Sequence, residues 1–139
     1  MKIAIKSSGH DFLGRSTAKG SLLLWTHYLR NITFSDAFFV GGKNLGSAVT
    51  AESGMPLNLL YNITRDAGKF FVGGVAPTVA AAGGYIQGGG HSSMSPAFGL
   101  ASDNVLGDDL YSHCTHYGYL FTYYRVQSRY CKWRPRYCK

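Results

Sequence analysis

The sequence predicts an α+β fold, and two observations support this prediction. Short runs of apolar and β-branched residues, each of strand length, recur between residues 3 and 72. Before the last of these runs lies one segment whose apolar residues follow the 3.6-residue period of an amphipathic helix. With 139 residues, of which 45% are hydrophobic, the chain is long enough for one domain with a modest core.

The expected strands are short and are separated by turn-forming residues. The first would lead directly into a glycine-containing loop that begins at Ser8. Gly41 and Gly42 lie between two apolar runs, where a turn is the expected use of glycine. The expected strands are residues 3–5, 21–26, 32–34, 38–40, 47–51 and 70–72.

One helix is expected between the last two of these strands. Pro56 suits its first turn, because the fixed φ of proline is helical and its missing N–H has no partner there anyway. Gly68 supplies the stop at the C-terminal end. The residues expected to share one face are Leu57, Leu60, Tyr61, Thr64 and Ala67.

Two glycine-containing segments are the most informative part of the sequence. Residues 83–90 hold five glycines in eight positions and are followed by His91. Backbone without side chains can direct its N–H groups at a pyrophosphate or lie along a planar ring. The spacing of Gly83 and Gly88 matches a P-loop, but Gly89 and Gly90 stand where that motif needs lysine and a hydroxyl residue. The second segment, residues 8–16, reads Ser-Gly-His-Asp-Phe-Leu-Gly-Arg-Ser.

Together with residues 98–106, Phe-Gly-Leu-Ala-Ser-Asp-Asn-Val-Leu, these segments resemble the berberine bridge enzyme-like FAD-linked oxidoreductases. That family belongs to the superfamily of para-cresol methylhydroxylase and vanillyl-alcohol oxidase. The resemblance covers residues 3–106. It implies a partial FAD-binding domain of the para-cresol methylhydroxylase type at residues 1–106, truncated at both ends, followed by a non-family tail at residues 107–139.

The resemblance also implies a cofactor and its attachment. His10 stands where the family has a histidine bonded to the 8α carbon of the flavin, a reaction that needs a neutral imidazole. Ala76 stands where many members have a second, cysteine tether, so we expect FAD to be held by a single covalent tether through His10. The cofactor-binding residues implied are Ser8, Gly9, His10, Asp11, Gly14, Thr78, Val79, Gly83, Gly84, Gly88, Gly89, Gly90, His91, Asn104 and Val105. Of these, Val79 is compatible with a place near the flavin but is more often simple packing, and an ordinary polar loop residue is at least as good an explanation of His91.

The activity implied is that of an oxidase, in which an organic substrate gives a hydride to the flavin and oxygen reoxidises it. A small organic substrate and molecular oxygen would be the partners of a complete relative, and such relatives are often secreted. No catalytic acid or base can be named, so the catalytic residues stay unknown. We expect no turnover from this chain alone, because the family's substrate domain lies beyond it. Neither a signal peptide nor an apolar stretch of about 20 residues is present, and no membrane partner is expected.

The tail from residue 107 to residue 139 differs in composition from the rest of the chain. It holds six Lys/Arg against two Asp, all three cysteines and seven of the ten tyrosines. The alternative function is a non-catalytic protein whose basic, aromatic tail binds nucleic acid or acidic surfaces. We expect instead a disordered tail without nucleic-acid binding, because the segment has no clean amphipathic period. His113, Cys114 and His116 form only a loose cluster, and no metal site is expected.

Overall fold

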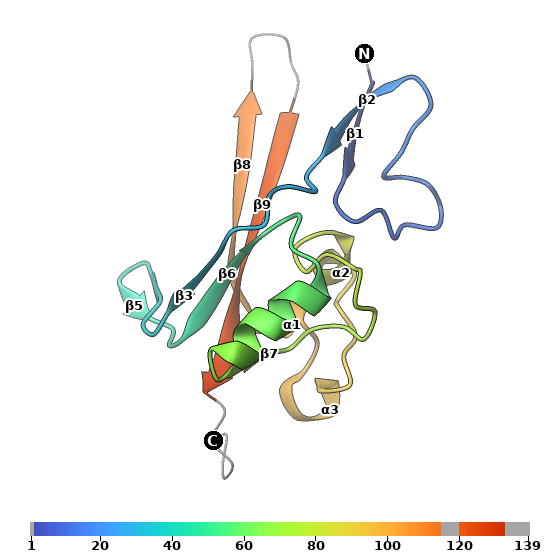
Figure 1. The fold of residues 1–139 in the computed structure, drawn as a ribbon. Coiled ribbons are helices and arrows are strands. Elements are labelled where there is room, and N and C mark those ends of the chain that lie inside the picture. Colours follow the sequence, from blue (N-terminus) through green and yellow to red (C-terminus); the bar gives the residue numbers. More distant parts are fainter. Residues whose placement is uncertain (1, 115–119, 133–139) are drawn as a thin grey trace.

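A computed structural model describes residues 2–114 and 120–132, with side chains described up to Leu106. Figure 1 shows a two-stranded sheet beside a larger sheet, a helix lying across the larger sheet, and a small hairpin that projects from the opposite end. The expected α+β fold is confirmed. No helix among the described residues is both long and apolar enough to span a bilayer.

The smaller sheet positions the first glycine-containing loop. Strands β1 (Lys2–Lys6) and β2 (Ser21–Trp25) are parallel, with Lys2 opposite Ser21 and Lys6 opposite Trp25. Because parallel strands cannot be joined by a tight turn, the chain between them must travel back along the sheet. Residues 7–20 make this connection, and the loop predicted to bind the cofactor therefore lies at the end of β1 (Figure 1).

The larger sheet has five antiparallel strands in the order β3-β6-β9-β7, with β8 also paired to β9. Strand β6 is buried along most of its length, and its residues Val49 and Ala51 belong to the core. The strands are β3 (Ile32–Ser35), β6 (Ala48–Glu52), β7 (Lys69–Phe71), β8 (Val105–Cys114) and β9 (Leu120–Lys132).

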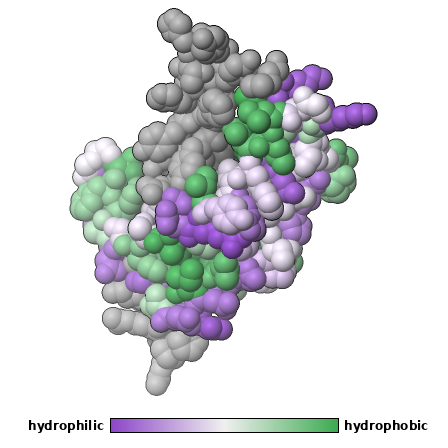
Figure 2. Space-filling model, turned by 45° about the horizontal axis from the view of Figure 1, so that its top comes forward, coloured by the Kyte–Doolittle hydropathy of each residue, from purple (hydrophilic) through white to green (hydrophobic). Residues whose placement is uncertain are grey.

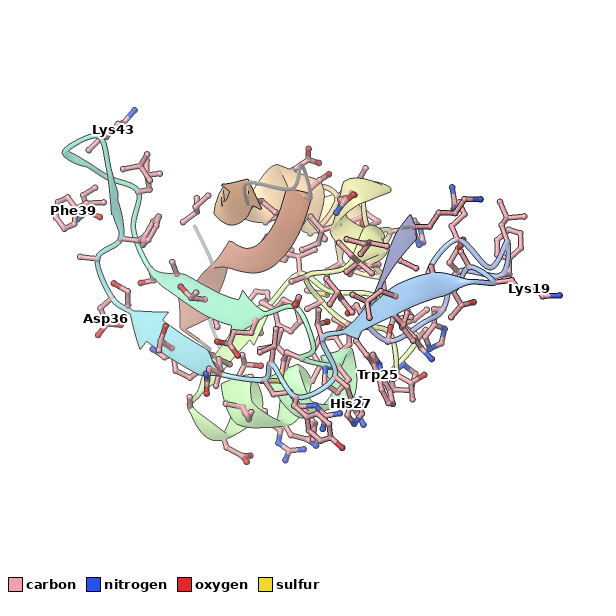
Figure 3. The ribbon with its side chains drawn as sticks, turned by 90° about the horizontal axis from the view of Figure 1, so that it is seen from above. Lys19, Trp25, His27, Asp36, Phe39 and Lys43 are labelled. Carbon is pink, nitrogen blue, oxygen red and sulfur yellow. The ribbon has the colours of Figure 1, made fainter. Side chains whose placement is uncertain are left out.

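A short hairpin interrupts the path from β3 to β6. Strands β4 (Phe39–Val40) and β5 (Lys43–Asn44) are joined at Gly41 and Gly42, whose φ angles of 55° and 80° favour glycine and confirm the expected turn. Figure 2 shows apolar side chains at the left of the visible face, where the hairpin projects in Figure 1. Phe39 is 58% exposed there. Figure 3 places Phe39 and Lys43 at the end of the molecule opposite Lys19.

The expected helix is confirmed as α1 (Leu57–Asp66), with Pro56 as its N-cap residue. Its buried residues are Leu57, Leu60 and Thr64, which lie on the predicted face. Leu57 and Leu60 pack with Val49, Ala51, Met55, Phe71 and Ala81 to form the core, and the Thr64 hydroxyl donates to the Leu60 carbonyl at 2.9 Å. Gly68 follows the helix with a φ of 64°, the left-handed conformation that ends a helix.

The segment from residue 84 to residue 104 contains short helices where the sequence indicated only a glycine loop. They are α2 (Gly84–Gln87), α3 (Ser95–Phe98) and the 3₁₀ helix η1 (Ser102–Asn104). Each is four residues or fewer, too short for a periodic apolar pattern to reveal it. The two-residue strand β5 escaped prediction for the same reason.

Two strands occupy much of the segment for which the sequence suggested a disordered tail. The backbone forms β8 up to Cys114 and β9 from Leu120 to Lys132, and β9 pairs with β6, β7 and β8. Residues 115–119 and 133–139 lie outside the described part of the chain. The domain boundary between residues 106 and 107 stays a prediction, although β8 runs across it.

Candidate functional site

A cavity of about 810 Å³ lies where the loop after β1 meets the segment leading into α2. Ser53, just after β6, and Thr26, just after β2, complete its wall. The loop and the glycine run are far apart in sequence, so only the fold brings them together. The lining residues are Ile5, Ser7, Ser8, Gly9, His10, Asp11, Phe12, Arg15, Ser16, Thr26, Ser53, Val79, Ala80, Ala82, Gly83, Gly84, Tyr85, Gln87 and Gly88.

Two hydrogen bonds join the walls of the cavity in antiparallel order. The Ala80 backbone N–H donates to Ser8 Oγ at 3.0 Å. His10, two residues after Ser8, pairs with Thr78, two residues before Ala80: His10 Nε2 lies 2.8 Å from Thr78 Oγ1. These contacts hold the histidine-bearing loop against the segment that precedes the glycine run.

The base of the loop is braced by residues outside the predicted set. The Ser7 hydroxyl donates to the Ser53 carbonyl. Trp25 Nε1–H donates to the Ser7 carbonyl at 3.0 Å, and the Trp25 ring lies 4.6 Å from the His27 ring (Figure 3). The Lys6 ammonium lies 5.0 Å from the centre of the Trp25 ring, within the range of a cation–π contact. The base of the loop is therefore held by contacts with the side chains of Trp25, Lys6 and His27.

Asp11 organises the turn that follows His10. Its carboxylate accepts from the Arg15 backbone N–H at 2.5 Å and from Arg15 Nη2 at 2.8 Å. The Gly14 N–H donates to the Asp11 carbonyl at 3.1 Å, which closes the turn. The hydrogen bond from the Arg15 side chain is the main cause that lowers the pKa of Asp11 below 3.8, its ordinary value.

This lowered pKa predicts an acid-sensitive loop. The pKa of Asp11 is lower in the folded chain than in the unfolded one. The Asp11–Arg15 contact therefore stabilises the fold fully at a pH above the unfolded-state pKa, and this stabilisation is lost as the pH falls through the folded-state pKa. We expect the chemical shift of the Arg15 backbone amide to titrate with a midpoint below 3.8. An NMR pH titration measures it. In Arg15→Gln the Asp11 midpoint should return toward the ordinary value, and an unchanged midpoint would contradict the assigned cause.

Tyr85 fills the space beside the glycine run. An added Cβ at Gly74 would lie 2.8 Å from the Tyr85 ring, and one at Gly90 would lie 2.9 Å from it. Burial raises the pKa of the Tyr85 phenol. Burial, and to a lesser degree the charge that Tyr85 would carry when ionised, raises the pKa of the Tyr61 phenol to about 12. Both phenols therefore stay protonated and donate, Tyr61 to the Gly74 carbonyl at 2.6 Å and Tyr85 to the His91 carbonyl at 3.2 Å.

The structure brings together about half of the residues proposed from the sequence. Those that line the cavity are Ser8, Gly9, His10, Asp11, Val79, Gly83, Gly84 and Gly88. Thr78 does not line it, but its hydroxyl contacts His10. Gly14, Gly89, Gly90, His91, Asn104 and Val105 are not among its lining residues.

Several of the residues outside the cavity have structural contacts that account for them. The Gly90 and Gly89 carbonyls accept from the backbone of Ala101 and Ser102, at 2.9 and 3.0 Å. The Asn104 side chain donates to the carbonyls of Phe98 and Leu100, each at 2.9 Å. The first pair of bonds fastens the end of the glycine run to the segment before β8, and the Asn104 bonds hold that segment together.

Several residues that line the cavity were not predicted from the sequence. Ser7, Arg15, Thr26, Ser53 and Tyr85 line the cavity. Ser7, Arg15 and Tyr85 lie within or beside the two glycine-containing segments, and that proximity was an available signal. Thr26 and Ser53 carry no such signal, because only the packing of β2 and β6 against the loop brings them there.

Two other kinds of candidate site are a second cavity and a group of metal ligands. A cavity of about 500 Å³ beside the end of α1 is lined by Tyr61, Asn62, Thr64, Arg65, Gly68, Lys69 and Phe70, none of them a predicted site residue. Within the described residues, no three His, Cys, Asp or Glu side chains are grouped so as to hold a metal ion.

Comparison with known proteins identifies the family to which this chain is similar. A family model described as an FAD binding domain matches residues 1–113. The chain is 47% identical over 110 residues to an uncharacterised FAD-linked oxidoreductase of Arthroderma benhamiae, covering 76% of this chain and 19% of that protein. It is 46% identical over 106 residues to an FAD-linked oxidoreductase of Gibberella zeae, covering 76% and 18%. The chain thus spans about a fifth of the length of these curated relatives.

Solved structures give the same result. The crystal structure of a VAO-type flavoprotein from Myceliophthora thermophila C1 superimposes with a TM-score of 0.82 at 31% identity, covering 94% of this chain and 27% of that one. A berberine bridge enzyme variant superimposes with a TM-score of 0.73 at 22% identity, covering 94% and 29%, which is a likeness of fold.

Proposed function

Because the chain belongs to the FAD binding domain family, we propose that it binds FAD in the cavity between residues 7–16 and 79–88 and holds it through His10. The family resemblance predicted from the sequence is confirmed. The observation that carries the proposal is the cavity itself, which unites eight residues proposed from two distant segments.

The cavity suits a dinucleotide in size and in lining. Its volume of about 810 Å³ lies within the range of about 300–1,000 Å³ that is usual for ligand pockets. A Cβ at Gly84 would meet no atom within 4 Å, so the backbone there borders open space that a ligand could occupy. Ser53 Oγ is buried without a hydrogen-bond partner among the described atoms, and a polar ligand beside it could supply one.

The proposed role is that of the FAD-binding part of an oxidoreductase. When bound, FAD would take a hydride from a small organic substrate and pass the electrons to oxygen. Residues of this chain would bind and orient the cofactor: Ser8 and Thr78 would hold the loop, and His10 would be the attachment point. Ala76 has no nucleophilic atom, so we propose a single tether.

The binding proposal predicts that a bulky side chain at Gly84 weakens FAD binding. Gly84→Leu would place an isobutyl group in the open space at the cavity wall, within a helix whose φ suits any residue. We expect the dissociation constant of FAD to rise by about tenfold or more, because the loss of well-placed contacts worth about 1.4 kcal/mol already has that effect. Equilibrium titration of the 139-residue chain with FAD measures it.

Ala97→Leu is the matched control. Ala97 is exposed in α3, another four-residue helix, and does not line the cavity, so the same side chain added there should leave FAD binding unchanged. Wild-type protein that fails to bind FAD would overturn the proposed function. Equal binding by wild type and Gly84→Leu would place the cofactor elsewhere.

The alternative function, binding of nucleic acid or acidic surfaces by the basic tail, stays a prediction. The side chains that it invokes, from residue 107 onward, lie outside those described. Replacing Arg134, Arg136 and Lys139 with glutamine leaves β8 and β9 in place, and a loss of affinity for single-stranded nucleic acid with FAD affinity unchanged would support it.

A further inference from the structure

The hydrogen bond between His10 and Thr78 occupies one of the two ring nitrogens of the proposed attachment residue. His10 Nε2 lies 2.8 Å from Thr78 Oγ1, although 68 residues separate them in sequence. Thr78 itself does not line the cavity, whereas His10 does. Any influence of Thr78 on a bound cofactor would therefore act through His10.

The direction of this hydrogen bond decides the chemistry of the other nitrogen. In a neutral imidazole one nitrogen carries the proton and the other has a free lone pair. If Nε2–H donates to the threonine hydroxyl, Nδ1 keeps its lone pair and could bond to the flavin 8α carbon. The C–H bond broken there would give its proton to solvent and its electron pair to the flavin ring, which dissolved oxygen would reoxidise. If the hydroxyl donates to Nε2, Nδ1 carries the proton and has no lone pair to give.

We propose that Thr78 is a positioning residue: its hydroxyl accepts a hydrogen bond from His10 Nε2–H and so keeps Nδ1 unprotonated and reactive. This inference rests on the proposed function, in which His10 is the attachment point for FAD. Thr78 needs no contact with the cofactor in this role. It fixes the orientation of the ring and the position of the ring proton before FAD arrives.

The neighbouring hydrogen bond gives a matched control. Ala80 N–H donates to Ser8 Oγ at 3.0 Å and joins the same two segments without touching the imidazole. Ser8→Ala removes that contact and leaves the His10–Thr78 pair in place. A general loosening of the two segments would affect both variants, whereas the proposed role is specific to Thr78.

The experiment compares Thr78→Val, Thr78→Ser and Ser8→Ala with the wild-type chain. Long-range ¹H–¹⁵N spectra at mildly alkaline pH report which nitrogen of His10 carries the proton, with the signals assigned by His10→Ala. We expect the Nε2–H form in wild type, Thr78→Ser and Ser8→Ala, and a mixture of both forms in Thr78→Val. The second readout, for wild type and the two Thr78 variants, is the rate at which added FAD comes to co-precipitate with acid-denatured protein. Ser8→Ala is compared on the tautomer alone, because Ser8 lines the cavity.

The attachment rate in Thr78→Val should fall about fivefold, the size expected for one exposed hydrogen bond. The rate is measured at saturating FAD, so that a change in non-covalent affinity caused by a looser His10 loop does not enter it. An unchanged His10 tautomer in Thr78→Val, or a Thr78→Ser variant that behaves like Thr78→Val, would overturn the inference. If the wild-type chain fails to bind FAD, the proposed function fails, and the tautomer comparison still decides the role of Thr78.

Discussion

Replacing His10 with alanine is expected to abolish covalent retention of flavin by this chain. After incubation with FAD and acid precipitation, wild-type protein should keep its flavin in the pellet, whereas His10→Ala should release it. The reason is that His10 lines the cavity and is the only residue at the predicted attachment position, while Ala76 has no nucleophilic atom at the second one. Tryptic digestion should recover the flavin on the peptide of residues 7–15, which lies between Lys6 and Arg15.

His91→Ala is the control for this experiment. It removes an imidazole that is exposed and does not line the cavity, so flavin retention should match that of wild type. Flavin recovered on a cysteine-containing peptide would contradict the single tether. Retention by His10→Ala would contradict the assignment of His10.

Gly54→Ala is expected to destabilise the fold severely. A Cβ at Gly54 would lie 2.0 Å from the Thr26 carbonyl oxygen and 2.8 Å from that of Leu29. Both are backbone atoms, so a side-chain rotation cannot relieve the clash. The Gly54 N–H also donates to the Leu29 carbonyl at 2.8 Å, which fixes the close approach. We expect a loss of about 3 kcal/mol or more in the free energy of unfolding, the upper end for overpacked positions. Urea denaturation followed by circular dichroism measures it.

Gly84→Ala is the matched comparison for stability. Gly84 has no positive φ, lies in a short helix and has no atom within 4 Å of an added Cβ. Its free energy of unfolding should stay within about 1 kcal/mol of the wild-type value. A Gly54→Ala protein as stable as Gly84→Ala would show that the turn at residues 53–54 can move away from β2.

The amphipathic and glycine-rich patterns explain where sequence reasoning succeeded. Helix α1 was predicted because Leu57, Leu60 and Thr64 recur at helical spacing between a proline and a glycine. The loop around His10 and the glycine run were identified as parts of one site because their residue types together match a family. The sequence did not predict strands β8 and β9. Strand β9 pairs with β6 and β7, and β8 pairs with β9, and these contacts join segments that are distant in sequence.

The sequence by itself determined the fold class, the helix, the family and the two segments that bear the candidate site, since these depend on local periodicity and on residue types at short spacing. The tertiary structure alone decided which of those residues share a cavity. The tertiary structure placed Thr26 and Ser53 in the wall of the cavity and brought Thr78 into contact with His10. It also used Gly90 and Asn104 for hydrogen bonds within the fold, away from the cavity. The physical reason is that the cavity forms where the loops that follow β1, β2 and β6 meet, and no local sequence pattern determines how far apart these loops lie.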